Sequence, residues 1–429
     1  MNGTLFSDVR IIDGVSATSY PGEVLVEGER VVAVARAPQA LPRTGAEVID
    51  GAGRTLMPGL TEAHAHLSFC GARDLHEFTR IPVEEHLLLT IENAKLLLER
   101  GFTSCFSAAA AKPRLDVVTR NAIDAGRFPG PRLRAATQEM TPSGNLGDLD
   151  TIELSLPPQV RFAVTCDSPD AFRAACRRAA REGVDTFKVN VSGDRGFDAW
   201  GAGTDATVIT DDELAAVVQV ARGRNKRVAA HATSAASVKM CVRHRVEVIY
   251  HAAMADEEAL DLLESAKDWV FVGPTIGFPY TLTHEADRYG VHHDAAAQRR
   301  LEAELESIVT VCQALRRRGI RVLPGGDYGL FCNPQGTNAR DLEHFVKLLG
   351  YAPMEAIQAA TRHGGALMGR PDELGQIGAG FLADLLLVDG DPLEDIAVLQ
   401  HPDRLHGIMK DGRFHKRPME ARRRRLAAE

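Results

Sequence analysis

The 429-residue sequence contains no apolar run that approaches the 18 or so residues needed to cross a membrane. Its first residues carry no basic stretch followed by an apolar stretch, so we expect no secretory leader. Cysteine is infrequent, with seven residues at wide spacing and no C-x-x-C pair. Such an odd and scattered set argues against a disulfide framework or a zinc knuckle and favours a reducing compartment. We therefore expect a cytoplasmic protein with no membrane partner.

An excess of positive charge is also lacking. The chain has 50 Lys and Arg against 58 Asp and Glu, a formal net charge of −8. A general basic field that would attract nucleic acid is thus excluded, and the arginine run at 422–425 is interpreted as the solvated end of a helix. No G-x-S-x-G motif occurs, which argues against a serine hydrolase. The G-x-G-x-x-A match at 201–206 does not directly follow a strand, so it does not indicate a dinucleotide site.

Both ends of the chain have the pattern of short strands. Residues 1–55 contain partly alternating β-branched stretches separated by Gly, Pro and Asp turns, and the same pattern returns from about 371. Two β-rich ends predict one small β-sandwich domain assembled from 1–56 and 371–429.

Between these ends, in 57–370, short apolar strands alternate with helical stretches. The candidate strands are LTEAHAH, FTSCFSAA, RLRAATQ, DTFKVNVS, RVAAHAT, VEVIYHA, WVFVGPTI and IRVLPGGD. Eight strands with intervening helices favour an α/β fold of the (β/α)8 TIM-barrel type, with an open doubly wound sheet as the alternative. The helices are predicted at 82–100, 168–182, 210–223, 256–267, 296–318 and 353–368.

Polar side chains recur at the ends of these strands, which is where a barrel of this type places its catalytic groups. The His-x-His spacing turns two imidazoles to the same side of a strand. Each residue alone has an ordinary structural explanation, such as a hydrogen-bonded His or a turn Asp. A barrel would bring them together, and the conjunction predicts one metal centre built from His64, His66, Lys188, His231, His251 and Asp327.

The chemistry of this set supports the same interpretation. Imidazole and carboxylate are ligands of Zn²⁺ and similar divalent ions. A lysine ammonium has no place among cations, but a lysine carboxylated by CO₂ becomes an anionic carbamate that can bridge two ions. The six residues in this order resemble the metal-dependent amidohydrolase superfamily, in its two-metal, carboxylated-lysine form, over essentially the whole chain.

The resemblance implies a TIM barrel with a β-sandwich from both termini and two bound divalent ions. Zn²⁺ is the first expectation, with Mn²⁺, Fe²⁺ and Co²⁺ as alternatives. A hydroxide held between the ions would attack the substrate, and Asp327 would take its proton and pass it to the leaving nitrogen. The resemblance assigns His64, His66 and Asp327 to the more buried ion, His231 and His251 to the more exposed ion, and a carbamate on Lys188 to both. Asp327, Lys188 and His251 are the expected catalytic residues.

Two stretches narrow the resemblance. MPGLTEAHAHLSF and LPGGDYGLFCNPQGTNARDLEHFV resemble the imidazolonepropionase-like and prolidase-like branch, and within it hydrolases of phenylurea and thiocarbamate herbicides. Asn145 in TPSGNLGD stands where dipeptidases of this branch have Gly-Gly-His, and NVSGDRGFDAW replaces their TGG after the lysine. Both departures argue against a dipeptidase pocket. We expect hydrolysis of an uncharged N-aryl or N-alkyl amide, urea or carbamate, such as a phenylurea.

Other functions stay open at this point. On the same framework they are an Xaa-Pro-type dipeptidase, an N-acyl amino acid amidohydrolase of the ochratoxin-cleaving type, and an imidazolonepropionase-like cyclic-amide hydrolase. An isomerase, deaminase or decarboxylase, and a non-enzymatic scaffold that keeps a metal, are more distant alternatives. Deaminating relatives generally lack the lysine, so Lys188 favours hydrolysis of an amide-type bond.

Two long segments, 190–209 and 277–294, follow strands at the expected catalytic face and are candidate lids. The expected partners are a small-molecule substrate and, by resemblance to relatives, further copies of the chain in a homo-oligomer. The candidate substrate contacts are Phe69, Asn145, Trp200, Tyr280 and Tyr328.

Overall fold

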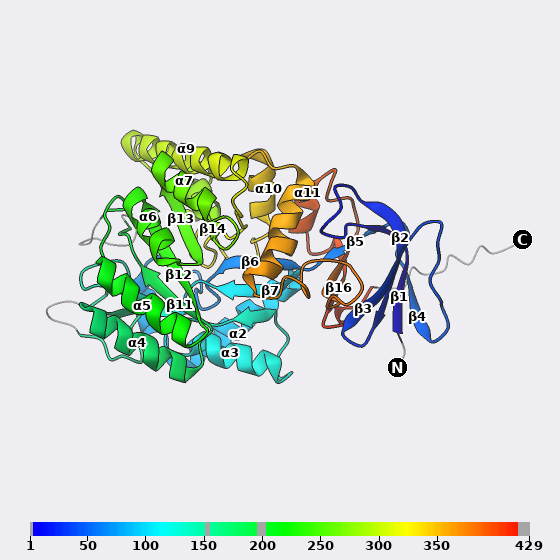
Figure 1. Ribbon diagram of the computed structural model, residues 1–429, viewed down its shortest axis with the longest axis horizontal. Helices are drawn as coiled ribbons and strands as arrows, with labels where there is room; N and C mark the ends of the chain where they lie inside the picture. The colour runs from blue at the N-terminus through cyan, green and yellow to red at the C-terminus, as the bar shows by residue number, and fades with distance from the viewer. Residues whose placement is uncertain (1–2, 151–154, 195–202, 419–429) are drawn as a thin grey trace, which may run out of the picture.

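The computed structural model describes residues 3–150, 155–194 and 203–418. It contains a large α/β body and a smaller β-domain that holds both ends of the described chain (Figure 1). Trp200 and the arginine run at 422–425 lie outside the described residues.

The body is a barrel of parallel strands. β9 pairs with β11, and the pairing continues through β12 and β13 to β14, while β6, β7 and β8 form a second parallel set. The predicted eighth strand closes the ring by backbone bonds on both sides: Leu323 N donates to Val272 O at 2.9 Å, and Ala63 N donates to Pro324 O at 3.3 Å. The expected TIM-barrel fold is thus confirmed. Its strands are β6 (Leu60–Ala65), β7 (Phe102–Ser107), β8 (Arg132–Arg134), β9 (Ala136–Thr141), β11 (Thr186–Asn190), β12 (Arg227–Ser234), β13 (Val248–Met254) and β14 (Phe271–Gly273), with β10 (Ala163–Thr165) beside β9.

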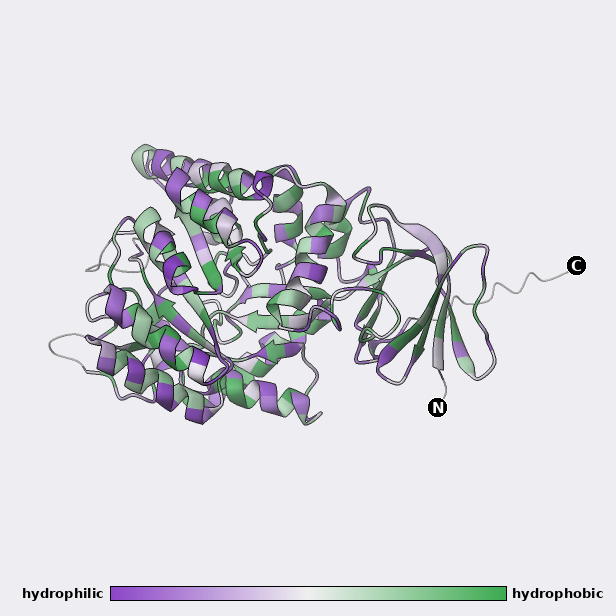
Figure 2. Ribbon diagram, in the orientation of Figure 1, coloured by the Kyte–Doolittle hydropathy of each residue, from purple (hydrophilic) through white to green (hydrophobic). Residues whose placement is uncertain are grey.

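Helices surround the strands and turn their apolar sides toward them (Figure 2). The six predicted helices are present, with bounds that differ by a few residues. Gly101, Gly183 and Gly319 follow three of them and adopt the left-handed φ values of 88°, 98° and 72° that end a helix. The helices are α1 (Leu75–Arg80), α2 (Val83–Glu99), α3 (Leu115–Asp124), α4 (Pro169–Glu182), α5 (Asp211–Gly223), α6 (Ala235–His244), α7 (Glu257–Ser265), α8 (Gly277–His284), η1 (Ala286–Tyr289), α9 (Ala295–Arg317), α10 (Arg340–Lys347), α11 (Pro353–Gln358), the π-helical turn η2 (Ala359–His363), α12 (Gly364–Leu367) and η3 (Ile396–Gln400).

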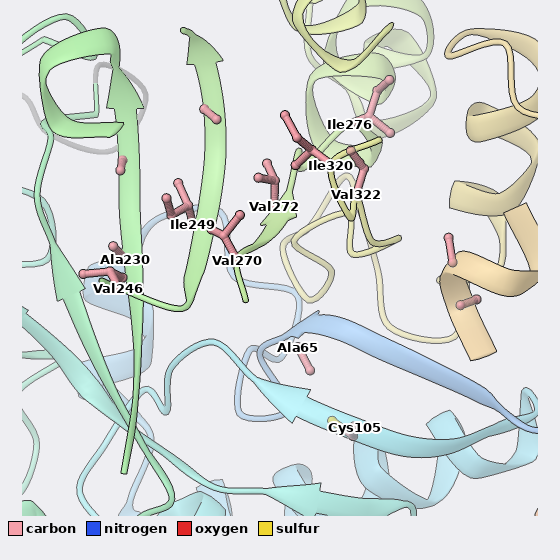
Figure 3. Close-up of a cluster of buried hydrophobic side chains, with 14 of the residues drawn as sticks. Ala65, Cys105, Ala230, Val246, Ile249, Val270, Val272, Ile276, Ile320 and Val322 are labelled. Atoms are coloured by element: carbon pink, nitrogen blue, oxygen red, sulfur yellow. The ribbon is translucent and has the colours of Figure 1, made fainter. Parts of the chain in front are cut away.

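The barrel strands are buried on both faces, as parallel strands covered by helices must be. Successive residues alternate between two buried clusters: Ala230 and Ile249 pack toward the helices, and their neighbours Ala229 and Val248 pack inside the barrel. Figure 3 shows the helix-facing layer, where small and β-branched side chains from neighbouring strands meet. This alternation decides which strand residues can reach the barrel interior, and therefore the site.

The smaller domain is one continuous mixed sheet of eight strands, where the sequence suggested a sandwich. β1 lies in its middle, antiparallel to β2 and parallel to β4 and β5. Val31, from the N-terminal part of the chain, and Met409, from the C-terminal part, belong to one buried cluster. The sheet therefore curves around its own core. Met57 and Pro58 pair with β15 and thus lie in this sheet, just past the predicted boundary at 56. The strands are β1 (Gly3–Ile11), β2 (Tyr20–Glu27), β3 (Arg30–Arg36), β4 (Ala46–Asp50), β5 (Thr55–Pro58), β15 (Leu385–Val388), β16 (Leu405–Lys410) and β17 (Arg413–Lys416).

None of the helices in the described part of the chain is both long enough and apolar enough to span a lipid bilayer.

Candidate metal centre

The C-terminal ends of the barrel strands surround one cavity. All six predicted metal-centre residues line it, although they come from segments that are far apart in the sequence. The strand period explains part of this arrangement, since Lys188 and His231 alternate with helix-facing neighbours such as Val189 and Ala230. The cavity is lined by His64, His66, Phe69, Leu75, Glu139, Leu146, Phe162, Lys188, Asp194, His231, His251, Asp327 and Leu330.

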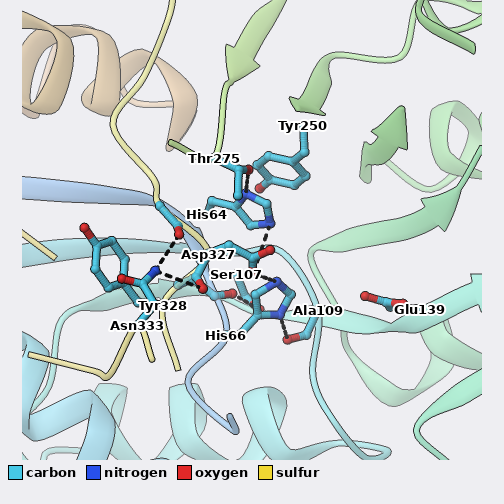
Figure 4. Close-up of polar contacts among 12 residues, drawn as sticks. His64, His66, Ser107, Ala109, Glu139, Tyr250, Thr275, Asp327, Tyr328 and Asn333 are labelled. Carbon is cyan, nitrogen blue, oxygen red and sulfur yellow. Dashed lines mark hydrogen bonds and ion pairs between the residues drawn. The ribbon is translucent and has the colours of Figure 1, made fainter. Parts of the chain in front are cut away.

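Three of the predicted ligands form a compact group (Figure 4). His66 Nε2 lies 3.1 Å from Asp327 Oδ1, and His64 Nε2 lies 3.7 Å from the same oxygen. Ligand atoms of all three lie within 4.8 Å of one another, which is a separation that a single divalent ion can bridge. The two imidazoles are almost fully buried, while the Asp327 side chain keeps 22% of its exposure. This group is therefore a possible metal site that opens toward the cavity.

The histidine rings are held by hydrogen bonds at their outer nitrogens. His66 Nδ1 lies 3.1 Å from the carbonyl oxygen of Ala109, and because a carbonyl only accepts, Nδ1 carries the proton. With Nδ1 bound to this carbonyl, Nε2 is the ring nitrogen that faces Asp327. His64 Nδ1 lies 2.9 Å from Thr275 Oγ1, and the His64 ring stacks on Tyr250 with centroids 3.8 Å apart. Such outer contacts fix the orientation of imidazole ligands before any ion binds.

The other three predicted ligands line the same cavity, where the His251 ring lies beside that of His64 with centroids 5.5 Å apart. The His231 and His251 rings are edge to face with centroids 4.3 Å apart. No third imidazole, thiolate or carboxylate joins them at ligand spacing among the described residues. Lys188 is 2% exposed, and its Nζ lies 5.0 Å from the Tyr250 ring centroid. Asp194 and Glu139 also line the cavity, and a carbamate on Lys188 would add a further anionic ligand for a second ion.

Burial sets the charge state of these groups. It lowers the pKa of His64 and His251 well below the ordinary value, and it lowers the pKa of His231 as well. Burial also lowers the pKa of the Lys188 ammonium. For Asp327, burial opposes ionisation, but the neighbouring His64 and His66 outweigh it and lower the pKa of the carboxyl. Neutral imidazoles at His64, His231 and His251 beside an ionised Asp327 carboxylate are the protonation states that a metal ion requires.

Three residues of the site adopt a left-handed backbone that side chains disfavour. The φ angles are 72° at His251, 57° at Thr275 and 61° at Asp327. In β13, Val248 and Tyr250 point into the barrel, so a regular strand would turn His251 toward the helices. The positive φ at His251 breaks that alternation and lets the imidazole line the cavity. Strain of this kind persists where the surroundings hold it, and it often marks functional sites.

A buried polar network below the site holds the backbone of two ligand segments. Glu62 Oε1 accepts a hydrogen bond from His64 N at 3.0 Å, and Glu62 Oε2 accepts one from Asn338 Nδ2 at 2.8 Å. Asp341 accepts from Gly325 N at 2.8 Å. Burial, together with the negative charge of Asp341, raises the pKa of Glu62 to about 8. No local pattern in the sequence indicates this network, since its members come into contact only when distant segments pack together.

The predicted substrate contacts lie in different surroundings, and among those within the described residues Phe69 is the one that lines the cavity. Phe69 lines the cavity and stacks on His66 with ring centroids 4.2 Å apart. Asn145 is buried and donates to Thr141 Oγ1 at 3.0 Å, outside the cavity lining. Tyr328 is buried and donates to Asp341 at 2.8 Å, so its hydroxyl is used in the network below the site. Tyr280 packs between His284 and His344, also away from the cavity, and Trp200 is outside the described residues.

Several cavity residues were missed in the sequence. Glu139, in the segment TQEMT of the third predicted strand, was not among the predicted site residues. Its place near the C-terminal end of a buried strand was the signal that could have identified it. The apolar walls Leu75, Leu146, Phe162 and Leu330 come from loops and a short helix, whose positions sequence patterns do not specify.

A model of the amidohydrolase family matches residues 55–414, and the chain belongs to this family. It is a hydrolase, and the match confirms the resemblance to the amidohydrolase superfamily. The family is generally metal-dependent, and the donor set of His64, His66 and Asp327 fits a divalent ion.

Relatives of known structure or sequence share the whole architecture. The chain is 24% identical to ochratoxinase from Aspergillus niger over 92% of this chain and 83% of that protein. It superposes on a prolidase complexed with N-methylphosphonate-L-proline with a TM-score of 0.85 and 25% identity, covering 97% of this chain and 100% of the other. It also superposes on phenylurea hydrolase B with a TM-score of 0.71 and 23% identity, covering 96% of each. These similarities leave the substrate of this chain open.

Proposed function

We propose that this protein hydrolyses the C–N bond of an uncharged amide, urea or carbamate that carries an N-aryl or N-alkyl group, such as a phenylurea. One observation carries the proposal: six potential metal-binding side chains and five apolar side chains line the same cavity. The apolar set of Phe69, Leu75, Leu146, Phe162 and Leu330 supports an aryl or alkyl group lying against the reacting bond.

The metal-binding residues divide into two sets. In this proposal His64, His66 and Asp327 hold one divalent ion, and His231 and His251 hold a second, with Lys188 as a carbamate between them. Zn²⁺ is the preferred ion, and Mn²⁺, Fe²⁺ or Co²⁺ are alternatives with the same ligand types. When bound, such ions supply a water of lowered pKa and polarise the substrate carbonyl.

The protein side chains move the proton. Asp327 is ionised and partly exposed to the cavity, so its carboxylate can accept a proton from the attacking water. The same group then returns the proton to the leaving nitrogen, which departs as a neutral amine. Hydrogen bonds to Ala109 and Thr275 keep the His66 and His64 rings oriented throughout.

A second candidate function has support from the relatives. Similarity to ochratoxinase and to a prolidase favours an N-acyl amino acid amidohydrolase or an Xaa-Pro-type dipeptidase. A cyclic-amide hydrolase of the imidazolonepropionase-like type belongs to the same framework. Asn145 in place of the expected histidine argues against the dipeptidase, and its amide is buried outside the cavity lining.

A substrate panel tests the proposal. Purified protein loaded with Zn²⁺, Mn²⁺ or Co²⁺ is assayed on a phenylurea, an anilide, a carbamate, an N-acyl amino acid, an Xaa-Pro dipeptide and a cyclic amide. We expect turnover of the urea, anilide or carbamate. Turnover of the dipeptide alone would refute the proposal. A double variant, His64→Ala and His66→Ala, serves as the control that attributes turnover to this site.

Two further expectations belong to the proposal. The chain acts as a cytoplasmic enzyme, which its seven unpaired cysteines support. It assembles as a homo-oligomer, and light scattering coupled to size-exclusion chromatography would show this directly.

A further inference from the structure

Glu139 is a buried carboxylate of the cavity that the proposed metal ligands leave unused. It lies on β9, is 6% exposed, and lines the cavity. In the pairing of β9 with β11 its direct neighbour is Lys188. Figure 4 shows its carboxylate apart from the group of His64, His66 and Asp327. A carboxylate so placed is costly unless it has partners.

One oxygen of this carboxylate is anchored. Asn190 Nδ2 donates to Glu139 Oε2 at 2.8 Å, and the same Nδ2 donates to Leu146 O at 3.1 Å. Because Leu146 O can only accept, the Asn190 amide must present its NH₂ group to Glu139. Gly147 lets the loop approach, since a Cβ there would lie 3.1 Å from Glu139 Oε2. The carboxylate is therefore held in one orientation.

The other oxygen is available to a ligand. No hydrogen bond from the described residues reaches Glu139 Oε1, and the side chain faces the cavity beside Leu146 and Phe162. An unmodified Lys188 ammonium would be its natural partner. A carbamate on Lys188 carries negative charge and cannot donate in that role, so the acceptor would then be left for the substrate.

We propose that Glu139 binds the substrate by accepting a hydrogen bond from an N–H of the amide or urea. This inference rests on the proposed function and narrows its substrate class. A substrate that keeps an N–H at the reacting group can donate a hydrogen bond to Glu139 Oε1. A fully N-substituted substrate has no such donor and leaves this buried oxygen unpaired. The cost of an unpaired buried acceptor corresponds to about a 10- to 100-fold preference in kcat/KM for the N–H compound.

The test uses matched substrate pairs and two variants. An anilide and its N-methyl counterpart, and a phenylurea with and without an N–H, are compared by kcat/KM and by calorimetric binding. Glu139→Gln preserves shape, but Asn190 requires an acceptor, so the glutamine would present its NH₂ to the cavity. Glu139→Ala removes the group. Glu306→Gln, an exposed position on α9, is the charge-matched control.

We expect the wild type and Glu306→Gln to prefer the N–H member of each pair, and both Glu139 variants to lose that preference while keeping the wild-type metal content. Loss of an ion in Glu139→Gln would make Glu139 a ligand instead and overturn the inference. A preference for the N–H substrate that survives in Glu139→Gln would also overturn the inference. The same holds if neither kcat/KM nor calorimetric binding shows a preference that depends on Glu139. Selective binding without turnover of any amide, urea or carbamate would uphold the role of Glu139 and refute the proposed function.

Discussion

His66 Nε2 lies 3.1 Å from the Asp327 carboxylate, although the two residues follow the first and the last strand of the barrel. Closure of the ring brings these strands side by side, as the bond from Ala63 N to Pro324 O shows. The compact group of His64, His66 and Asp327 therefore forms only if the barrel closes.

Replacing the proton carrier should reduce the rate. Asp327→Asn removes the carboxylate that accepts the proton, and we expect kcat to fall about 10²- to 10⁴-fold with the fold retained. Steady-state kinetics and circular dichroism measure the two effects. The exposed Asp372→Asn is the control and should behave as the wild type. A kcat within twofold of wild type in Asp327→Asn would remove Asp327 from the mechanism.

Replacing the bridging lysine should change the metal content. We expect about two ions per chain in the wild type, and fewer in Lys188→Ala together with loss of activity, because the variant cannot form the carbamate that would bridge the ions. Elemental analysis of dialysed protein gives the ion count. Lys267→Ala, exposed after α7, is the matched control. Two ions and full activity in Lys188→Ala would refute the bridging role.

Removing the metal should destabilise the protein as well as inactivate it. A ligand that binds the folded chain adds about 3 kcal/mol to the free energy of unfolding at a free concentration of about 100 times its Kd. We expect a chelator to lower the melting temperature and Zn²⁺ to restore it. The same titration on His66→Ala should show little shift, whereas His292→Ala, at an exposed position, should respond as the wild type. An unchanged melting temperature in chelator would argue against a bound ion.

The close approach of the last strand to the first requires Gly325. A Cβ at this position would lie 2.7 Å from both the backbone nitrogen and the Cβ of His64. We expect Gly325→Ala to cost about 1–3 kcal/mol of unfolding free energy and to weaken metal binding by displacing His64. Gly223→Ala is the control, since no atom lies within 4 Å of its added Cβ. Equal urea midpoints for both variants would contradict this account.

Acid should destabilise the protein partly through His363. Burial lowers the pKa of this histidine to about 4, and its Nδ1 has no partner in the described part of the chain. Between pH 6.5 and 4 the unfolded chain binds a proton that the folded chain does not. The contribution of this group to stability is therefore intact above pH 6.5 and falls as the pH drops toward 4.

The variant His363→Gln isolates that effect. Lowering the pH from 6.5 to 4 should reduce the free energy of unfolding of both proteins. We expect the reduction in the variant to be smaller than in the wild type by on the order of 2–3 kcal/mol. Urea titrations at several pH values measure the difference, in which the other titrating groups cancel. Parallel stability curves for the two proteins would show that His363 is solvated in the folded state.

Much of the architecture followed from local patterns. The alternation of short apolar strands with amphipathic stretches identified the barrel and six of its helices. α3 and α6 were not among the predicted helices, and the N-cap residue of α3, Arg114, makes no side-chain cap hydrogen bond that would mark the start of that helix. The terminal strands were recognised, but their joining into one curved sheet depends on pairings between the two chain ends.

In the candidate site, too, some residues could be predicted from local patterns and others depend on the tertiary fold. His64, His66, Lys188, His231 and Asp327 could be placed from their positions at strand ends. His251 was predicted for the same reason, yet a regular strand would have turned its side chain away from the cavity. Tyr328 looked like a pocket residue, but its hydroxyl lies within reach of the buried Asp341, which its neighbours in the sequence do not reveal.

The sequence by itself determined the type of fold and the chemical character of the centre, because strand and helix periods and metal-binding side chains are local properties. Only the tertiary structure decided how His251 reaches the cavity, which residues hold the ligand backbones, and that Glu139 lines the cavity wall. The reason is physical: burial and hydrogen bonding between distant segments set orientation and charge, and neither is encoded in the neighbouring residues of the chain.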